Sequence, residues 1–195
     1  REGEWTTHVT GRIAPAPEEN SEIASEACLV VQSDSDPRDR FAPILDELQI
    51  DWGPQWWWIT AGEKIDARVA RGRFEPPDGI DRNEAPLPPV LIDNSFALEL
   101  FLAEPGLGDG TPRLPFSVER VRWNGRSGRA VGAEFFLHEG EGCSGARESI
   151  SGDLVYRDEK GGELARIEGY TTRRAPEALF LAGEKRGARH LYRFG

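Results

Sequence analysis

Asp93 lies within a long apolar run, VLIDNSFALELFLA, which covers residues 90–103. At helical spacing Asp93 shares one helix face with Phe96, Ala97 and Leu100, and none of these three side chains is charged. Burial among hydrocarbon disfavours an ionised carboxylate and raises its pKa, as a general acid working near neutral pH requires. The pattern therefore predicts that Asp93 donates a proton in a reaction.

A structural explanation of Asp93 is also open. Asp, Asn and Ser at positions 93–95 are residue types that accept hydrogen bonds from the first amides of a helix. If the helix began here, Asp93 would be its N-cap and would need no chemical role. The position at which the helix begins distinguishes the catalytic role of Asp93 from the capping role.

Three consecutive tryptophans occur in WGPQWWWIT, residues 52–60. On a strand, Trp56 and Trp58 would point to one face of the sheet and Trp57 to the other. One face of such a strand must pack against the helix. Filling of the core by large aromatic side chains is an alternative to a role in binding.

The remaining periodicities predict the elements that position these residues. A short amphipathic helix is expected over residues 36–49, where Phe41, Ile44, Leu45 and Leu48 recur at helical spacing. A hairpin follows, with strands at 52–60 and 64–74 and a turn at Ala61-Gly62-Glu63. After the apolar helix, four strand-like stretches alternate with turns, at 115–125, 130–140, 148–158 and 163–173.

This order of elements predicts an α+β fold, in which an antiparallel sheet wraps around a long central helix that is apolar on nearly all sides. That is the arrangement of a hot-dog fold. We expect the hot-dog domain at residues 26–176. Residues 1–25 are expected to hold the last strand of a preceding unit and a linker, and residues 177–195 a C-terminal tail.

Composition excludes several classes of protein. The chain has 195 residues, a formal net charge of -10 and a pI near 4.9, so nucleic acid and anionic membrane surfaces would repel it. Cys28 and Cys143 form no CxxC pair, and no histidine cluster accompanies them, so neither a zinc site nor any other metal site is expected. No apolar run reaches the ~20 residues of a membrane helix, and no secretory signal begins the chain. We expect a cytoplasmic protein with free thiols.

Several stretches resemble the dehydratase domains of polyketide synthases. PPVLIDNSFA, residues 88–97, is similar to the HPALLDAALQ-type motif of the second hot-dog of those domains, with Asp93 at the catalytic aspartate. The other similar stretches follow in the family's order: WTTHVTGRIAPAP (the end of the first hot-dog and its linker), RFAPILDELQIDWGPQWWWI (around YGPxF), LPFSVERVRW (LPFSW), RIEGYTTRRAP (the closing strand) and HLYRF.

The resemblance implies the second half of a double hot-dog. In that family the first half supplies a histidine that removes the α-proton of a β-hydroxyacyl thioester, and the aspartic acid of the second half helps the β-hydroxyl leave as water. The implied partners are an N-terminal hot-dog half that carries the histidine and an acyl carrier protein whose phosphopantetheine holds the substrate. A homodimer within a megasynthase is also implied, and no other cofactor. Three alternatives remain: a non-catalytic scaffold or dimerisation module, double-bond isomerisation, and cyclisation.

The resemblance also implies the substrate-binding residues and shows where this chain departs from the family. Trp56 and Trp58 would wall an acyl channel, with Gly53 and Pro54 forming a tight turn beside it. Pro88 and Pro89 replace the His-Pro that precedes the family's aspartate. Trp52 replaces the tyrosine of YGPxF, and Ala97 replaces the Gln or His that lies one turn after the aspartate. The residues expected to bind substrate are Trp52, Gly53, Pro54, Trp56, Trp58, Pro89 and Ala97.

The histidines and the basic residues complete the sequence predictions. His8, His138 and His190 are expected at the surface, so none replaces the family's catalytic histidine. An acidic carrier protein would need a basic surface on this acidic chain. The candidates for that surface are Arg173, Arg174 and the tail residues Lys185, Arg186, Arg189 and Arg193.

Overall fold

The structure is a computed structural model, and it describes residues 10–15, 36–47, 52–80, 85–102, 113–125, 128–139 and 148–174. The helices are α1 (Pro37–Glu47), α2 (Pro89–Phe96) and the 3₁₀ helices η1 (Pro54–Trp56) and η2 (Ala97–Phe101). The strands are β1 (Ile59–Lys64), β2 (Val69–Phe74), β3 (Arg113–Ser117), β4 (Arg120–Trp123), β5 (Gly132–Leu137), β6 (Ser149–Arg157) and β7 (Glu163–Arg174). The expected N-terminal linker and C-terminal tail fall almost entirely outside these residues, so the domain boundaries stay a prediction.

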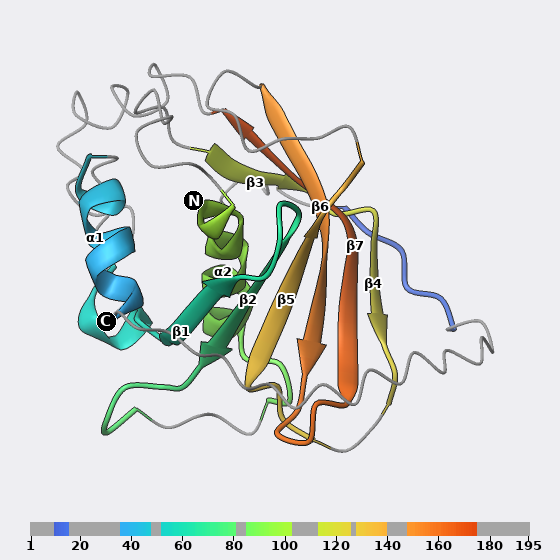
Figure 1. Cartoon of the computed structure of the whole chain (residues 1–195). Helices are drawn as coiled ribbons and strands as arrows, with labels where there is room; N and C mark the ends of the chain where they lie inside the picture. The colour runs from blue at the N-terminus through green and yellow to red at the C-terminus, as the bar shows by residue number, and fades with distance from the viewer. Residues whose placement is uncertain are drawn as a thin grey trace, which may run out of the picture.

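One antiparallel sheet forms the body of the fold. Its strand order is β1-β2-β5-β6-β7-β3, and β4 pairs with the part of β7 that β3 leaves uncovered. The sheet curves around α2, while α1 lies on the far side of α2 from the sheet's centre (Figure 1). The expected α+β arrangement of a sheet wrapped around a central helix is therefore confirmed.

The central helix begins and ends close to its predicted limits. Pro88 is extended and Pro89 occupies the first helical position, where its missing amide hydrogen costs nothing. The helix continues beyond Phe96 as η2, so its second half is tighter than an α-helix. Its buried side chains include Leu91 and Leu98, which lie in the hydrophobic core.

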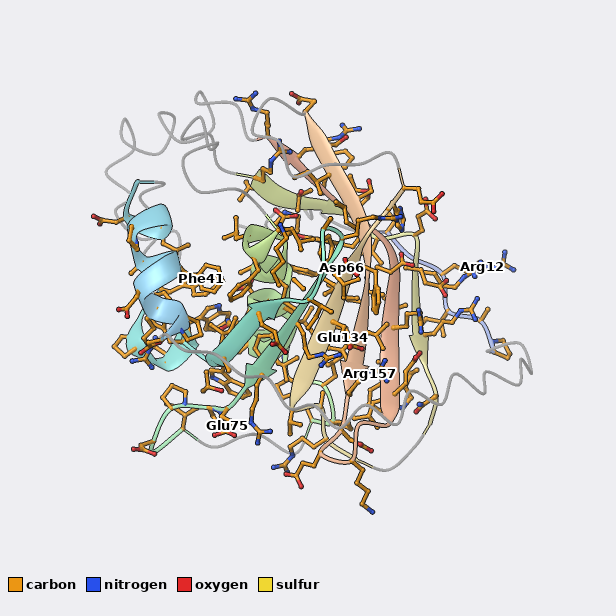
Figure 2. All side chains as sticks on the ribbon, viewed as in Figure 1. Arg12, Phe41, Asp66, Glu75, Glu134 and Arg157 are labelled. Atoms are coloured by element: carbon orange, nitrogen blue, oxygen red, sulfur yellow. The ribbon has the colours of Figure 1, made fainter. Side chains whose placement is uncertain are left out.

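Two glycines on the hairpin let the sheet approach η2 closely. A Cβ at Gly62 of β1 would overlap the ring of Phe101, and a Cβ at Gly72 of β2 would lie 2.6 Å from Leu98 Cδ2. Phe101 also packs edge-on against Phe41 of α1, with ring centroids 5.1 Å apart. Phe41 points from α1 towards the central helix (Figure 2). These contacts join α1, the hairpin and η2 into one core.

The predicted hairpin differs from the observed one at both ends. Residues 54–56 form a 3₁₀ turn, in which the amide of Trp56 donates to the carbonyl of Gly53 at 2.8 Å, so the strand begins at Ile59. Pro54 has no amide hydrogen for a sheet and favours the first position of such a turn. The strand then runs through the expected turn, and the chain reverses at Asp66, whose Oδ1 accepts the amides of Arg68 and Val69.

The face of the sheet away from α2 carries a buried ionic cluster. Glu134 on β5 accepts from Arg71 on β2 and from Arg157 on β6, and Arg157 also donates to the carbonyl of Gly161. Glu134 and Arg157 are 4% and 5% exposed. Figure 2 shows them side by side on the neighbouring strands. The cluster satisfies charges that would otherwise be costly to bury.

The described ranges show neither a membrane-spanning helix nor a cluster of metal ligands. None of their helices is long and apolar enough to cross a membrane. Within the same ranges, no group of three His, Cys, Asp or Glu side chains is arranged to hold a metal ion. Cys28 and Cys143 lie outside the described residues.

Candidate active site

Asp93 lies one turn inside α2, four residues after Pro89. The N-cap of this helix is Pro88, and no side chain caps it. The alternative in which Asp93 begins the helix is therefore wrong. Asp93 is half-buried on a face of α2 that it shares with Val90, Phe96 and Ala97, which are half-buried too.

The carboxyl group of Asp93 accepts one strong hydrogen bond from the tryptophan-rich stretch. Trp56 Nε1 donates to Asp93 Oδ2 at 2.7 Å. Burial raises the pKa of Asp93 above its ordinary value, and the hydrogen bond from Trp56 opposes part of that rise. Desolvation is the larger effect, so the protonated acid persists to higher pH than in water.

Two more indoles donate within the same stretch, residues 52–58, which we call the tryptophan segment. Trp57 Nε1 donates to the carbonyl of Trp52 at 2.8 Å, and Trp58 Nε1 donates to the carbonyl of Gln55 at 3.1 Å. Trp52 and Trp57 also meet edge-on, with ring centroids 5.1 Å apart. The predicted alternation of the tryptophans along a strand is wrong, because a 3₁₀ turn and a connector replace the strand here.

The side chains of the tryptophan segment lie at different depths. Trp58 belongs to the hydrophobic core and is 4% exposed. Trp52, Trp56 and Trp57 are half-buried, and the guanidinium of Arg38 lies 6.0 Å from the ring centre of Trp57. Of these three indoles, Trp56 contacts Asp93 directly and is itself half-buried.

Asn94 and Ser95 follow Asp93 on α2, and both are fully buried. Asn94 bonds to the backbone of the tryptophan segment and of Ile59. The hydroxyl of Ser95 donates to the carbonyl of Ile92 and lies 2.9 Å from the hydroxyl of Tyr156. Burial raises the pKa of Tyr156, so this hydroxyl stays protonated.

A second buried acid, Glu99, was missed by the sequence reasoning. Thr172 Oγ1 donates to Glu99 Oε2 at 3.2 Å, and Glu99 is 6% exposed. Burial raises the pKa of Glu99 to about 7, against the opposing effects of Thr172 and the charge of Arg113. The signal was present, since Glu99 is the second acid in the apolar run at 90–103.

Tyr170 of β7 lies beside both carboxyl groups. Its ring stacks on Phe96 with centroids 4.3 Å apart. Burial raises the pKa of Tyr170, and the charges of Glu99 and Asp93 raise it further. The side of α2 that faces β7 is thus a polar but water-poor environment.

The remaining residues predicted to bind substrate lie on the same two elements. Gly53 and Pro54 begin the 3₁₀ turn of the tryptophan segment, Pro89 is the exposed first residue of α2, and Ala97 is the half-buried first residue of η2. The hydrogen bonds from α2 to the tryptophan segment bring these two groups together. Their contact with a substrate stays a prediction.

The one histidine in the described ranges, His138, lies elsewhere. His138 Nε2 is 2.8 Å from Asp153 Oδ1, and Asp153 also accepts the amide of Gly169. Leu137 and Leu154, which flank this pair in sequence, are in the core, so His138 and Asp153 face away from α2. His8 and His190 lie outside the described residues.

A sheet wrapped around a helix that places a carboxyl group in a desolvated position defines this chain as a hot-dog domain with a candidate acid. Comparison with protein families then identifies it: the chain belongs to the polyketide synthase dehydratase N-terminal domain family, whose model matches residues 23–181. Comparison with curated proteins finds no significant match.

Solved structures of dehydratases share the fold. An N-terminal dehydratase from the difficidin assembly line is 18% identical with a TM-score of 0.69, and the match covers 91% of this chain and 61% of that one. The dehydratase domain from the CurJ module of curacin polyketide synthase is 21% identical, with a TM-score of 0.62 and coverage of 87% and 57%. A trans-AT polyketide synthase dehydratase domain from Brevibacillus brevis is 17% identical, with a TM-score of 0.62 and coverage of 75% and 50%. The chain thus spans about half the length of the dehydratase chains that it matches.

The family match corrects the assignment to the second half of a double hot-dog. The matching family is the N-terminal domain, so the prediction of a C-terminal half was wrong. Both halves of a double hot-dog wrap a sheet around one helix and therefore share the order of helix, strands and turns. Short motifs placed along that order do not separate one half from the other.

Proposed function

We propose that this chain is part of a polyketide synthase dehydratase that removes water from β-hydroxyacyl chains, with Asp93 as the acid. The observation that carries the proposal is the half-buried carboxyl of Asp93, which accepts a 2.7 Å hydrogen bond from Trp56 and whose pKa burial raises. Burial favours the protonated form of this carboxyl, which is the form that can deliver a proton to a leaving hydroxyl. Membership of the dehydratase family supports the reaction class.

The reaction balances as an elimination. A base removes the α-proton of the thioester, the β-carbon–oxygen bond breaks, and the hydroxyl leaves as water with the proton of Asp93. The product is an α,β-unsaturated thioester, and the proton taken by the base restores Asp93. The family resemblance assigns the base to a histidine of the first half and the acid to the second half. The family match places this chain in the first half, so the role of Asp93 rests on its burial and its bond to Trp56 and not on the motif. In the described residues His138 is bound to Asp153, away from α2, so we expect the base from outside the described residues.

The substrate is expected to lie between the tryptophan segment and α2. Trp52, Gly53, Pro54 and Trp56 would contact it from one side, with Trp58 behind them. Pro89 and Ala97 would contact it from the other side. Half-buried aromatic and apolar surface beside Asp93 supports an acyl chain as the ligand, because such surfaces bind apolar chains while a few polar groups fix the orientation.

A second hot-dog half is the expected partner. This chain spans 50–61% of the length of the three dehydratases described above. The strands β3 and β4 form an edge of the described sheet. Five large apolar side chains are exposed on this edge: Leu114, Phe116, Val118, Val121 and Trp123. An exposed apolar edge strand favours pairing with another sheet, so we assign this edge to the other half. The family resemblance further implies homodimerisation.

An acyl carrier protein would present the substrate on its phosphopantetheine. Arg173 at the end of β7 is exposed and its guanidinium lies 3.7 Å from the ring centre of Phe116. Together with Arg174 it offers positive charge to an acidic carrier. The basic residues of the tail lie outside the described residues.

Replacement of Asp93 by asparagine tests the proposal. The chain would be combined with its second half and assayed on a β-hydroxyacyl pantetheine thioester, with the unsaturated product measured by absorbance and mass spectrometry. Asp93→Asn should lower kcat at least about 100-fold. Asp66→Asn, in an exposed turn, is the matched control and should keep full turnover. Full turnover by Asp93→Asn would reject the role of the acid.

One observation favours a second candidate, a non-catalytic dehydratase-like module. Ala97, which shares a face with Asp93, carries no polar group that could orient the hydroxyl to be removed. Isomerisation of a double bond or ring closure on the same carrier-bound substrates are related alternatives. Incubation with β-hydroxyacyl, β,γ-unsaturated and hydroxy-enoyl thioesters would distinguish them, since each reaction gives a product of different mass or absorbance.

A further inference from the structure

Asn94 makes three hydrogen bonds to one short stretch of backbone. Its Oδ1 accepts the amides of Trp58 at 3.0 Å and Ile59 at 3.2 Å. Its Nδ2 donates to the carbonyl of Trp56 at 2.9 Å. The side chain is 0% exposed, so these bonds form without competition from water.

The pattern of bonds requires an amide side chain. One end must accept from two N–H groups and the other must donate to a carbonyl, and asparagine offers both on a short side chain. A carboxylate would lack the donor, and an apolar side chain of similar size would lack both functions. The pattern also fixes which end of the amide is oxygen, because the flipped side chain would set donors against donors.

The backbone held by Asn94 has few regular hydrogen bonds of its own. The amide of Trp58 reaches the carbonyl of Trp56 at 3.1 Å, while that of Trp57 reaches Pro54 at 3.4 Å, which is long for such a bond. This stretch joins a 3₁₀ turn to the first residue of β1. The sheet reaches it through the amide of Glu75, which donates to the carbonyl of Trp58 at 2.7 Å, while the amides of Trp58 and Ile59 turn to Asn94. Asn94 therefore supplies the fixed partners that regular structure would otherwise provide.

Trp56 is held at two points by neighbouring residues of α2. Its carbonyl accepts from Asn94, and its indole N–H donates to Asp93. We propose that Asn94 is a positioning residue that holds the tryptophan segment against α2 so that the Trp56 indole reaches Asp93. This inference rests on the proposed function for the role of Asp93, but the coupling between the three residues does not depend on it.

Ser95 provides a matched comparison. It follows Asn94 on the same helix and is equally buried. Its hydrogen bonds go to Ile92 and Tyr156 rather than to the tryptophan segment. Loss of its hydroxyl would remove a buried hydrogen bond without releasing Trp56.

A double-mutant cycle tests the inference, with the pKa of Asp93 measured by carboxyl-carbon NMR on the whole chain. The variants are Asn94→Leu, Trp56→Phe, the two combined, and Ser95→Ala. Asn94→Leu and Trp56→Phe should each raise the pKa of Asp93, since each removes the indole bond that opposes the effect of burial. Asn94→Leu should cause no further rise once Trp56 is phenylalanine, and Ser95→Ala should leave the pKa unchanged.

An unchanged pKa in Asn94→Leu, or an equal rise with and without the indole, would overturn the inference. If Asn94→Leu does not fold, hydrogen exchange on the unmodified chain replaces it. The amides of Trp58 and Ile59 should then exchange as slowly as the core strands, and fast exchange of both would overturn the inference.

The activity assay separates this inference from the proposed function. Asn94→Leu should lower kcat about tenfold or more with a smaller change in KM, because it displaces a group next to the acid. If Asp93→Asn keeps full turnover while the pKa cycle gives the expected coupling, the proposed function fails and the positioning by Asn94 stands.

Discussion

Thr172 on β7 donates a hydrogen bond of 3.2 Å to the carboxyl group of Glu99 on η2, so a strand of the sheet is tied to the central helix through a buried acid. The acid lies 73 residues earlier in the chain than its donor. Burial raises the pKa of Glu99 from 4.5 to about 7. The folded state therefore binds a proton that the unfolded state has already lost over this pH interval.

The stability of the domain should consequently depend on pH through Glu99. Below pH 4.5 both states are protonated and the fold keeps this contribution in full. As pH rises from 4.5 to about 7 the unfolded state ionises first, so the free energy of unfolding falls. Above pH 7 the loss should reach up to about 3 kcal/mol. Urea denaturation at pH 5 and pH 8 measures it.

Glu99→Gln should remove this dependence, because the amide keeps the shape and can still accept from Thr172. The variant should be more stable than the unmodified chain at pH 8, while Glu159→Gln in an exposed turn should behave like the unmodified chain. Equal pH dependence of Glu99→Gln and the unmodified chain would show that Glu99 is not the group responsible.

The contact between Gly62 and Phe101 leads to a prediction about packing. A methyl group at position 62 would overlap the Phe101 ring, so Gly62→Ala should destabilise the domain by about 1–3 kcal/mol. Alanine in a strand would otherwise be favoured over glycine. Thermal or urea unfolding measures the change.

Two further variants test whether the contact with Phe101 causes the loss of stability. Gly11→Ala, where nothing lies within 4 Å, should change stability by less than about 0.5 kcal/mol. Combining Gly62→Ala with Phe101→Leu should cost less than the sum of the single changes, because the smaller side chain makes room. Additive costs would mean that Phe101 is not the obstacle.

The fold was largely predictable because periodicity reports burial. The apolar run at 90–103 indicated the central helix, and alternating stretches after residue 113 indicated the strands of the sheet. The register between neighbouring strands and the breaks within strands could not be predicted from periodicity. The stretch at 115–125 divides into β3 and β4 near Glu119, where Gly169 on β7 adopts a φ of 62°, and that break depends on contacts distant in sequence.

The sequence predicts the acid of the candidate site, Asp93, but not the residues that bind it or hold its neighbours. Asp93 stands out as a charge in an apolar run, whereas Trp56 reaches it across 37 residues through a 3₁₀ turn that the tryptophan pattern did not indicate. The local sequence around Asn94, with Asp, Asn and Ser at 93–95, is typical of a helix start and predicts Asp93 as an N-cap. The hydrogen bonds of Asn94 go to residues that lie 35 to 38 positions before it in the chain, which local sequence does not encode.

The exposed edge of the sheet gives a prediction about assembly. Phe116→Lys should weaken association with the second hot-dog half at least about tenfold, because Phe116 is 58% exposed on the edge assigned to that partner. Ile65→Lys, at an exposed apolar position in the β1–β2 turn, is the matched control and should leave the affinity unchanged. Sedimentation or calorimetry with the separately expressed half measures both. Equal loss in both variants would place the interface elsewhere.

The bond between Trp56 and Asp93 predicts how the reaction depends on pH. An acid must be protonated to act, so turnover should fall as pH rises through the pKa of Asp93, which burial holds above its ordinary value. Trp56→Phe removes the hydrogen bond that favours the ionised form, so the pKa should rise and the alkaline fall in turnover should move to higher pH. The maximum rate should fall at the same time, because the carboxyl loses its positioning partner. Trp57→Phe is the matched control, since that indole donates to the carbonyl of Trp52, and its pH profile should match the unmodified chain. A shift to lower pH in Trp56→Phe, or an identical shift in Trp57→Phe, would contradict the assignment of Asp93 as the titrating acid.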